Sequence, residues 1–298
     1  MGSVMVAIVV GLLGAITFGS ADFLGGIASK RISAVRVTAI GALSGLAVLL
    51  VMLCLIGGSW SINAVLLGML SGLCGSTAIM LLYACLAIGP MSILSPITAV
   101  VSALVPMFVA VARGERLPPV GYLGLAIALV AVVLVGFVPE KGAVRPSIRA
   151  MTMAVTSGAL IGLFLVVIDL TPPSSGLVPL VSNRATSVVV MFSLVAGMWW
   201  WSRGKIADSP GARVGFLSPG WRAGLWLAAL AGVVDAGGNT LLLIGLRLGD
   251  LTIQSVLTAL YPAGTIILAA ILLRERIAPV QIVGLALALV ASALVALA

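Results

Sequence analysis

Ten apolar runs, each about as long as a membrane span, follow one another along the 298-residue sequence. A helix needs about 20 apolar residues to cross the hydrocarbon layer, where no water can bond free backbone groups. Only 8% of the residues are charged, against about 25% in a typical soluble domain. The sequence therefore predicts an all-α integral membrane protein of ten transmembrane helices, at 4–27, 33–56, 64–87, 91–112, 120–138, 151–169, 177–201, 223–246, 252–273 and 279–298.

The two halves of the sequence repeat each other. When residues 115–135 are shifted by 160 positions they overlie 275–295, with 13 of 21 positions identical, and the match runs back without a gap through Gly89 and Gly249. Five spans per repeat is an odd number, so the second copy enters the membrane in the opposite orientation. Inverted repeats around a central cavity are a recurring plan of secondary transporters. The predicted units are repeat 1 at 1–138, a polar linker at 139–149, and repeat 2 at 150–298.

Lysines and arginines lie mostly on one side of the predicted membrane. The loops after the first, fifth, seventh and ninth spans, with their flanks, carry twelve of the 16 basic residues, whereas the opposite loops carry Arg113, Arg116 and Arg247. Cytoplasmic loops are enriched in lysine and arginine. We therefore expect a multi-pass protein of the cell membrane, with these four loops in the cytoplasm and both termini outside. The net charge of +8 comes from these loops, so no nucleic-acid partner is expected.

Ionisable residues inside a membrane span cost about 2.5–3.5 kcal/mol each on insertion scales, so they are candidates for function. Asp235 lies near the centre of the eighth span, and Asn239 follows one turn later on the same face. One interpretation is a polar wall of a central cavity that binds a solute or a proton. The other is a hydrogen bond that only packs two helices together. The glycine-rich surroundings of Asp235 allow a neighbouring backbone or a ligand to approach closely, and of the two interpretations we favour the cavity wall.

A carboxylate precedes an arginine by a similar distance in each half of the chain. Asp22 precedes Arg36, and Asp169 precedes Arg184, which follows Asn183. Antiparallel neighbouring helices would bring each carboxylate close to its arginine. Such pairs would act as gates or substrate clamps between conformations, or as static ion pairs that lower the cost of insertion.

The ninth span carries a second group of polar residues, with a proline near its middle. A proline inside a helix removes a hydrogen bond and bends the axis. The polar side chains are expected either to line the cavity or to pack against neighbouring helices. The candidate lining residues are Gln254, Thr258 and Tyr261, and the expected helix breaks are Pro262 and, in the first half, Pro96 and Pro106.

The sequence contains no histidine, which is the commonest general base and metal ligand. The aspartates inside the spans are too few and too scattered for a metal site built from carboxylates. We therefore expect no catalytic residues, no enzyme activity, no metal and no cofactor.

The stretches at 18–31 and 258–290, with the Arg36 and Arg184 positions, resemble the EamA family of the drug/metabolite transporter superfamily. The resemblance implies a ten-helix inverted-repeat fold and the export or exchange of small metabolites such as amino acids, by alternating access. Multidrug or cationic compound efflux, and less so an intramembrane enzyme, are the alternatives. The expected partners are a small-molecule substrate and the lipid bilayer, with proton coupling as a hypothesis. The sequence leaves the oligomeric state open, with a monomer as one option. Many proteins of this family keep both termini in the cytoplasm, whereas the charge bias here predicts the reverse.

A carboxyl group in a dry cavity favours its protonated form, so Asp22 or Asp235 could carry a proton in exchange for solute. The change Asp22→Asn or Asp235→Asn at a coupling site is expected to abolish transport driven by a pH gradient while sparing solute binding. Proton-driven flux at the parent rate in both variants would reject this hypothesis.

Overall fold

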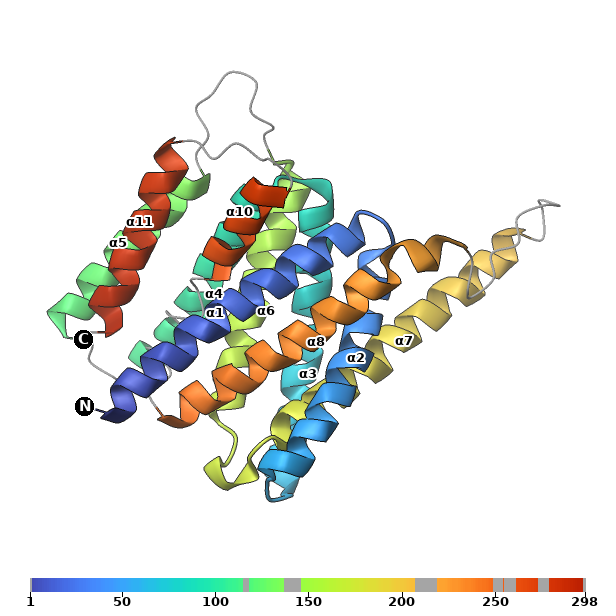
Figure 1. Ribbon diagram of the computed structural model, residues 1–298, viewed down its shortest axis with the longest axis horizontal. Helices are drawn as coiled ribbons and strands as arrows, with labels where there is room; N and C mark the ends of the chain where they lie inside the picture. Colours follow the sequence, from blue (N-terminus) through green and yellow to red (C-terminus); the bar gives the residue numbers. More distant parts are fainter. Residues whose placement is uncertain are drawn as a thin grey trace.

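The computed structural model describes residues 2–114, 118–136, 146–206, 219–248, 254, 261–272 and 279–296. These residues form long α-helices and one short 3₁₀ turn (Figure 1). The helices of the first half are α1 (Gly2–Ser29), α2 (Ala34–Ile56), α3 (Ile62–Ile88), α4 (Met91–Ala112) and α5 (Pro119–Gly136). Those of the second half are α6 (Ile148–Asp169), the turn η1 (Pro173–Ser175), α7 (Val178–Ile206), α8 (Pro219–Leu248), α10 (Tyr261–Leu272) and α11 (Pro279–Ala296).

Six of the described helices are long and apolar enough to cross a membrane. They are α1, α2, α3, α6, α7 and α8. The apolar segment of α1 is Val9–Ser29, and that of α8 is Gly224–Leu248. Their length and composition bear out the prediction of an all-helical membrane protein. The finer prediction of ten membrane crossings stays a prediction.

Several helices extend beyond the predicted spans, α7 and α8 by the most. α7 continues to Ile206 and α8 begins at Pro219, whereas the apolar runs cover 177–201 and 223–246. In α7 the lysine and arginine residues that follow the apolar run are good helix formers, so they end the hydrophobic segment without ending the helix.

The prolines lie in two different settings. Pro96 and Pro106 are inside α4, as predicted. Pro262 follows Tyr261, where the described part of α10 begins. Residues 255–260 lie outside the described part of the chain, so the predicted helix break at Pro262 stays a prediction.

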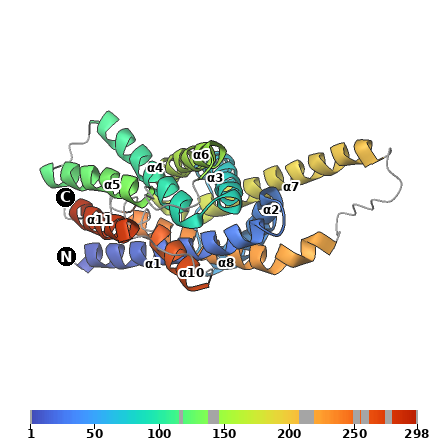
Figure 2. The same ribbon diagram turned by 90° about the horizontal axis from the view of Figure 1, so that it is seen from above.

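The most extensive helix contacts are preserved when the two halves are exchanged, whereas the smaller α1–α3 and α2–α3 contacts have no counterpart of similar extent in the described part of the second half. α1 packs on α8 and α6 packs on α3, while α1 packs on α10 and α6 packs on α4. Likewise α2 packs on α8 and α7 packs on α3, and the pairs α2–α7, α4–α10 and α5–α11 each join one helix to its counterpart. α5 and α11 lie together at one end of the molecule in both views (Figures 1 and 2). The observed packing therefore has an approximate two-fold relation between residues 2–136 and 148–296.

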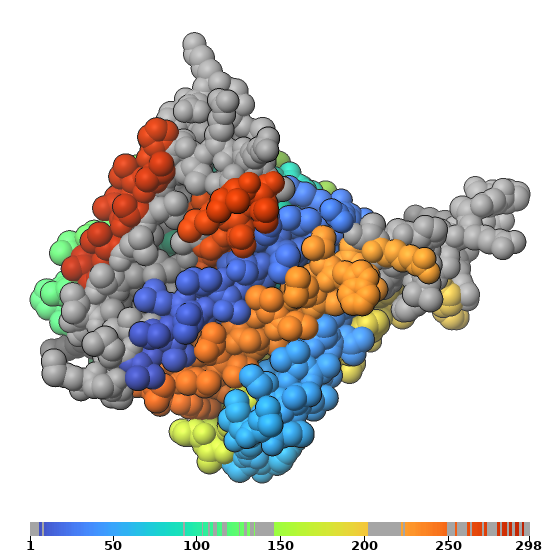
Figure 3. All heavy atoms as spheres, viewed as in Figure 1, coloured from blue at the N-terminus to red at the C-terminus, as the bar shows by residue number. Residues whose placement is uncertain are grey.

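Glycines let α8 and α3 approach their neighbours closely. Gly232 of α8 lies against the backbone of Gly41 in α2, and Ser44 of α2 donates a hydrogen bond to the Ala229 carbonyl of α8 at 2.9 Å. In the other half, Gly72 of α3 lies against the Asn183 carbonyl of α7. Small residues at such crossings allow the backbones of membrane helices to meet. Figure 3 shows α1, α8 and α2 running side by side across one face of the molecule.

A methyl group at position 232 is expected to destabilise the protein, because a Cβ there would meet the Gly41 backbone and the Ser44 hydroxyl. Overpacking of this kind costs about 1–3 kcal/mol. The matched control is Gly237→Ala on the same helix, where a Cβ would meet only Thr17 Cγ2 at 3.9 Å. Thermal unfolding in detergent should show a lower Tm for Gly232→Ala and an equal or higher Tm for Gly237→Ala. Equal Tm values for the two variants would contradict the close helix contact.

Candidate functional site

A cavity of about 60 Å³ lies between the two halves of the chain. α1 and α3 contribute its wall from the first half, and α6, α7, α8 and α10 contribute it from the second half. The volume is enough for several water molecules or part of a small solute, since a water needs about 10–15 Å³ measured in this way. The wall is mostly apolar, and its polar side chains are Asp22, Asn183, Arg184, Asp235, Asn239 and Tyr261.

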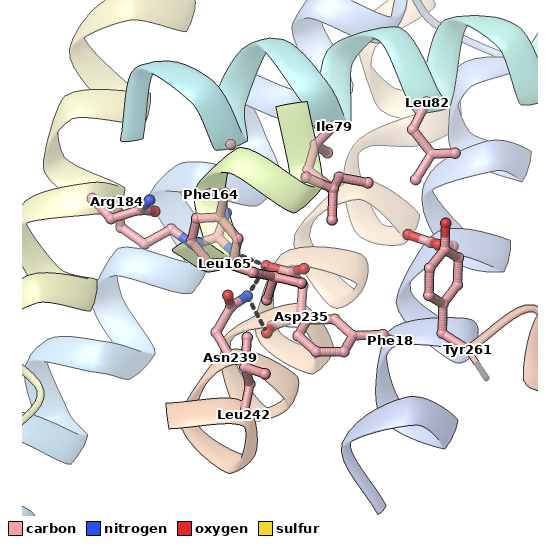
Figure 4. A pocket seen from close by; sticks show the side chains of 14 residues that line it. Phe18, Ile79, Leu82, Phe164, Leu165, Arg184, Asp235, Asn239, Leu242 and Tyr261 are labelled. Atoms are coloured by element: carbon pink, nitrogen blue, oxygen red, sulfur yellow. Dashed lines mark hydrogen bonds and ion pairs between the residues drawn. The ribbon is translucent and has the colours of Figure 1, made fainter. Parts of the chain in front are cut away.

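An ion pair between α7 and α8 dominates one side of the cavity (Figure 4). Arg184 pairs with the Oδ2 atom of Asp235, and the two side chains are 11% and 7% exposed. Asn239 Nδ2 donates to the same Oδ2 at 3.0 Å and to the Asp235 carbonyl at 2.9 Å. The one-turn spacing of Asp235 and Asn239 makes this bond possible. The arginine therefore has its charge balanced, and the carboxylate is held by two partners.

Small and polar neighbours position the α7 residues. A Cβ at Gly45 of α2 would stand 3.6 Å from Arg184 Nε. The guanidinium therefore lies next to α2 at a position where that helix has no side chain. Asn183 Nδ2 donates to Ser71 Oγ of α3 at 2.9 Å. This buried bond and the packing of α7 against α2 and α3 are made in the rotation of α7 that places Arg184 beside Asp235 of α8.

Asp22 of α1 is a second buried carboxylate on the cavity wall, with 5% of its surface exposed. Within the described part of the chain its carboxylate makes no hydrogen bond or ion pair. The side chains of Tyr83 and Tyr261 are close enough to interact with it electrostatically. Asp22 therefore differs from Asp235, whose charge is balanced by an arginine.

α10 closes the cavity beside Asp22. Tyr261 OH donates to the Ser95 carbonyl of α4 at 3.5 Å, and Thr265 Oγ1 donates to the Gly19 carbonyl of α1 at 3.0 Å. Figure 4 shows Tyr261 and Phe18 on the opposite side of the cavity from Arg184. The start of α10 is thus tied to both α1 and α4, and its tyrosine forms part of the wall.

The structure gathers six of the predicted site residues in this cavity: Asp22, Asn183, Arg184, Asp235, Asn239 and Tyr261. Arg36 does not line it. Gln254 is buried away from it, and its Nε2 donates to the Ala7 carbonyl at 3.0 Å, so this residue packs helices together. Thr258 lies outside the described residues.

The predicted pairing of arginines and carboxylates is wrong for Arg184, which pairs with Asp235 of α8 and not with Asp169. Asp169 is the last residue of α6 and interacts electrostatically with Arg247. α7 packs against α2 and α3, and the Asn183–Ser71 bond is made in the observed rotation of this helix. The spacing of charges in the sequence carries no information about this rotation.

Most of the apolar wall was not foreseen from the sequence. Phe18, Ile161, Phe164 and Leu242 are among its residues, but a lipid-facing and a cavity-facing apolar residue look alike in a membrane span. The sequence could have pointed to Gly75, because it corresponds to Asp235 when the first half is shifted by 160 positions. Among the described residues no three histidine, cysteine or carboxylate side chains gather in a way that could hold a metal ion.

A helical membrane protein with a charged cavity between two related halves belongs to the class of membrane transport proteins. The sequence matches the EamA-like transporter family twice, over residues 5–137 and 148–297, so the chain belongs to that family. The family resemblance seen in the sequence is thereby confirmed. A solved crystal structure, described only as that of a protein, has the same fold at a TM-score of 0.67 and 19% identity, covering 97% of this chain and 95% of that chain. A search of curated proteins finds no match.

Removing one partner of the buried pair is expected to destabilise the protein, because it leaves an unbalanced charge at a cost of about 3–5 kcal/mol. The variants are Arg184→Gln, Asp235→Asn and the double variant, compared by thermal unfolding in detergent. The double variant should lose less stability than the sum of the two single changes. Strictly additive losses would show that the two side chains do not interact.

Proposed function

We propose that this EamA-family protein is a secondary active transporter that moves a small metabolite through the cavity by alternating access. The observation that carries the proposal is the cavity itself, which has charges of both signs and walls from both halves of the chain. Buried charges in membrane spans are costly and mark substrate or ion pathways. As a member of a transporter family, the protein is not expected to be an enzyme.

The proposed frame is two inverted repeats of five spans, at 1–138 and 150–298, joined by the linker at 139–149. The exchange relation among the helix contacts and the two family matches support this frame. In transporters of this plan the solute binds near the membrane midplane, and one repeat moves against the other. The cavity between α1 and α3 of the first half and α6 and α8 of the second half supports this mechanism.

The solute class that fits best is a small zwitterion, such as an amino acid or a related metabolite, that is exported or exchanged. Its carboxylate would compete with Asp235 for the Arg184 guanidinium, which can bind a carboxylate through two hydrogen bonds. Its ammonium group would be balanced by Asp22 or by the released Asp235. Phe18 and Phe164 offer an apolar surface for the rest of the molecule.

Cationic compound efflux is the second candidate, and Asp22 is the observation that favours it. Because Arg184 already has Asp235, the carboxylate of Asp22 leaves the described cavity with a net negative charge when it is ionised. Cations bind well to aromatic faces beside a carboxylate, and Phe18 and Tyr261 lie in the same wall. A cation would leave the Arg184–Asp235 pair intact, whereas a zwitterion would open it.

For the orientation in the cell membrane, we propose that the loops after the predicted first, fifth, seventh and ninth spans are cytoplasmic. The termini would then be outside, together with the α2–α3 and α6–α7 loops. The distribution of lysine and arginine supports this orientation.

Filling the cavity is expected to abolish transport. In Gly75→Leu the new side chain would enter the cavity wall beside Asn183 and Phe164, whose nearest atoms are 3.6 Å from a Cβ at this position. The control Gly197→Leu adds the same side chain to α7 at a site with nothing within 4 Å. Purified proteins are screened by thermal shift against amino acids, amines and organic cations, and ligands found are tested for uptake and efflux in liposomes.

The parent protein and Gly197→Leu should catalyse flux of the stabilising solute, and Gly75→Leu should reduce that flux at least about tenfold, an effect of about 1.4 kcal/mol. Stabilisation by zwitterions would favour the first solute class, and stabilisation by amines without a carboxylate would favour the second. Equal flux through all three proteins would exclude the cavity as the pathway.

A further inference from the structure

Two loops from different halves of the chain are joined at one end of the molecule. Ser59, in the α2–α3 loop, donates to the Ser174 carbonyl of η1 from its backbone N–H at 3.0 Å and from its hydroxyl at 2.7 Å. Leu177 N–H donates to the Gly57 carbonyl at 3.4 Å. Gly57 and Gly176 adopt φ angles of 80° and 51°, which favour glycine, and no side chain separates the two loops there. The loops are therefore in direct backbone contact.

Arg247, near the end of α8, holds the same α6–α7 loop. Its Nη1 donates to the Thr171 carbonyl at 3.0 Å, and its Nη2 donates to Thr171 Oγ1 at 2.7 Å and to the Pro172 carbonyl at 3.3 Å. Asp169 adds an electrostatic attraction. Hydrogen bonds from a charged donor are the stronger kind. One arginine thus fastens α8 to the segment that Ser59 holds from the other half.

A dry layer separates these contacts from the cavity. α8 runs from Leu242, in the cavity wall, to Arg247 over about 7.5 Å, and α7 covers a similar distance from Asn183 to Val178. Buried apolar side chains between the two levels belong to one cluster, which includes Ile168, Leu177, Leu180 and Leu246. Water and solutes cannot cross such a layer while its helices stay packed. The cavity is therefore closed toward this end.

We infer that Ser59, Thr171, Pro172, Ser174 and Arg247 form a latch that closes one end of the cavity and must open for a solute to pass there. The inference rests on the proposed transport function. Movement of one half against the other would separate Ser59 from Ser174. Opening the cavity between α6, α7 and α8 would also separate Arg247 from Thr171. The latch thereby sets how often this end opens.

The latch arginine is present in one half only. At the shift of 160 positions, Arg247 corresponds to Ala87 of α3. The residue that corresponds to Arg247 at the opposite end therefore has no guanidinium. The described conformation is the one in which the latch is made.

The test measures how fast a thiol in the cavity reacts. Leu242→Cys is placed in a background in which the three free cysteines, Cys54, Cys74 and Cys85, are changed to alanine. A membrane-impermeant maleimide is added to intact cells and, separately, to inverted vesicles. Arg247→Ala should speed labelling from the latch face about tenfold, since a hydrogen bond to a charged group contributes at least that much. The control Arg113→Ala removes an exposed arginine from the end of α4 and should leave the rate unchanged.

A second pair of variants keeps the test decisive if Arg247→Ala does not fold. Thr171→Val removes the hydroxyl that accepts from Arg247 and should speed labelling, whereas Thr171→Ser keeps it and should not. A disulfide between Ser59→Cys and Ser174→Cys should prevent labelling from the latch face until a reductant is added. Unchanged rates in Arg247→Ala and Thr171→Val, or labelling unaffected by the disulfide, would overturn the latch.

The labelling needs no transported solute, so the two proposals can fail separately. Faster labelling in Arg247→Ala without flux of any solute in liposomes would keep the latch as a closure and remove the transport function. Flux through the parent protein with labelling that ignores Arg247 would keep transport and remove the latch.

Discussion

Hydrocarbon offers no hydrogen bonds and no solvation to polar groups, and every level of this structure follows from that constraint. Backbone groups are bonded within helices, so the described residues form helices and short connections. The charged side chains inside the spans must face protein, and Asp22, Arg184 and Asp235 all do so at one cavity. In the Arg184–Asp235 pair the desolvation energy of each buried charge is offset by the opposite charge beside it, and Asn239 also donates a hydrogen bond to the carboxylate.

A membrane protein cannot use the hydrophobic effect to hold its helices together, since lipid is as apolar as leucine. In this protein the helices are held together by close contact between their backbones instead. Gly232 meets the backbone of Gly41, and Gly72 meets that of Asn183, so dispersion contacts and serine hydrogen bonds join the helices. Gly45 likewise has no side chain, which leaves room for Arg184 beside α2. Glycines therefore allow both the close packing of the helices and the placement of the charged site.

The two halves have similar helix packing, but Asp235 at the cavity and Arg247 at its proposed closure have no charged counterpart in the other half. Gly75 and Asp235 occupy corresponding positions on α3 and α8, and both lie in the cavity wall, but only one carries a charge. Ala87 and Arg247 correspond in the same way, and only the arginine reaches a loop. The solute site and the proposed closure of the cavity are therefore asymmetric, although the most extensive helix contacts around them exchange between the halves.

The class of the protein follows from its amino-acid sequence, because the length and apolarity of its runs leave lipid as the only suitable solvent. The ungapped match of 115–135 with 275–295 shows the repeat, and the stretches at 18–31 and 258–290 indicate the family. The sequence also points to Asp22, Arg184, Asp235 and Asn239, because a polar or charged group inside a span is costly whichever way it faces. Which charges meet depends on how the helices pack. The rotation of α7 about its axis, in which the Asn183–Ser71 bond is made, places Arg184 beside Asp235. The burial of Gln254 between helices and the contact of Arg247 with Thr171 were decided in the same way, because the facing of a residue in a uniformly apolar helix depends on its neighbours in space.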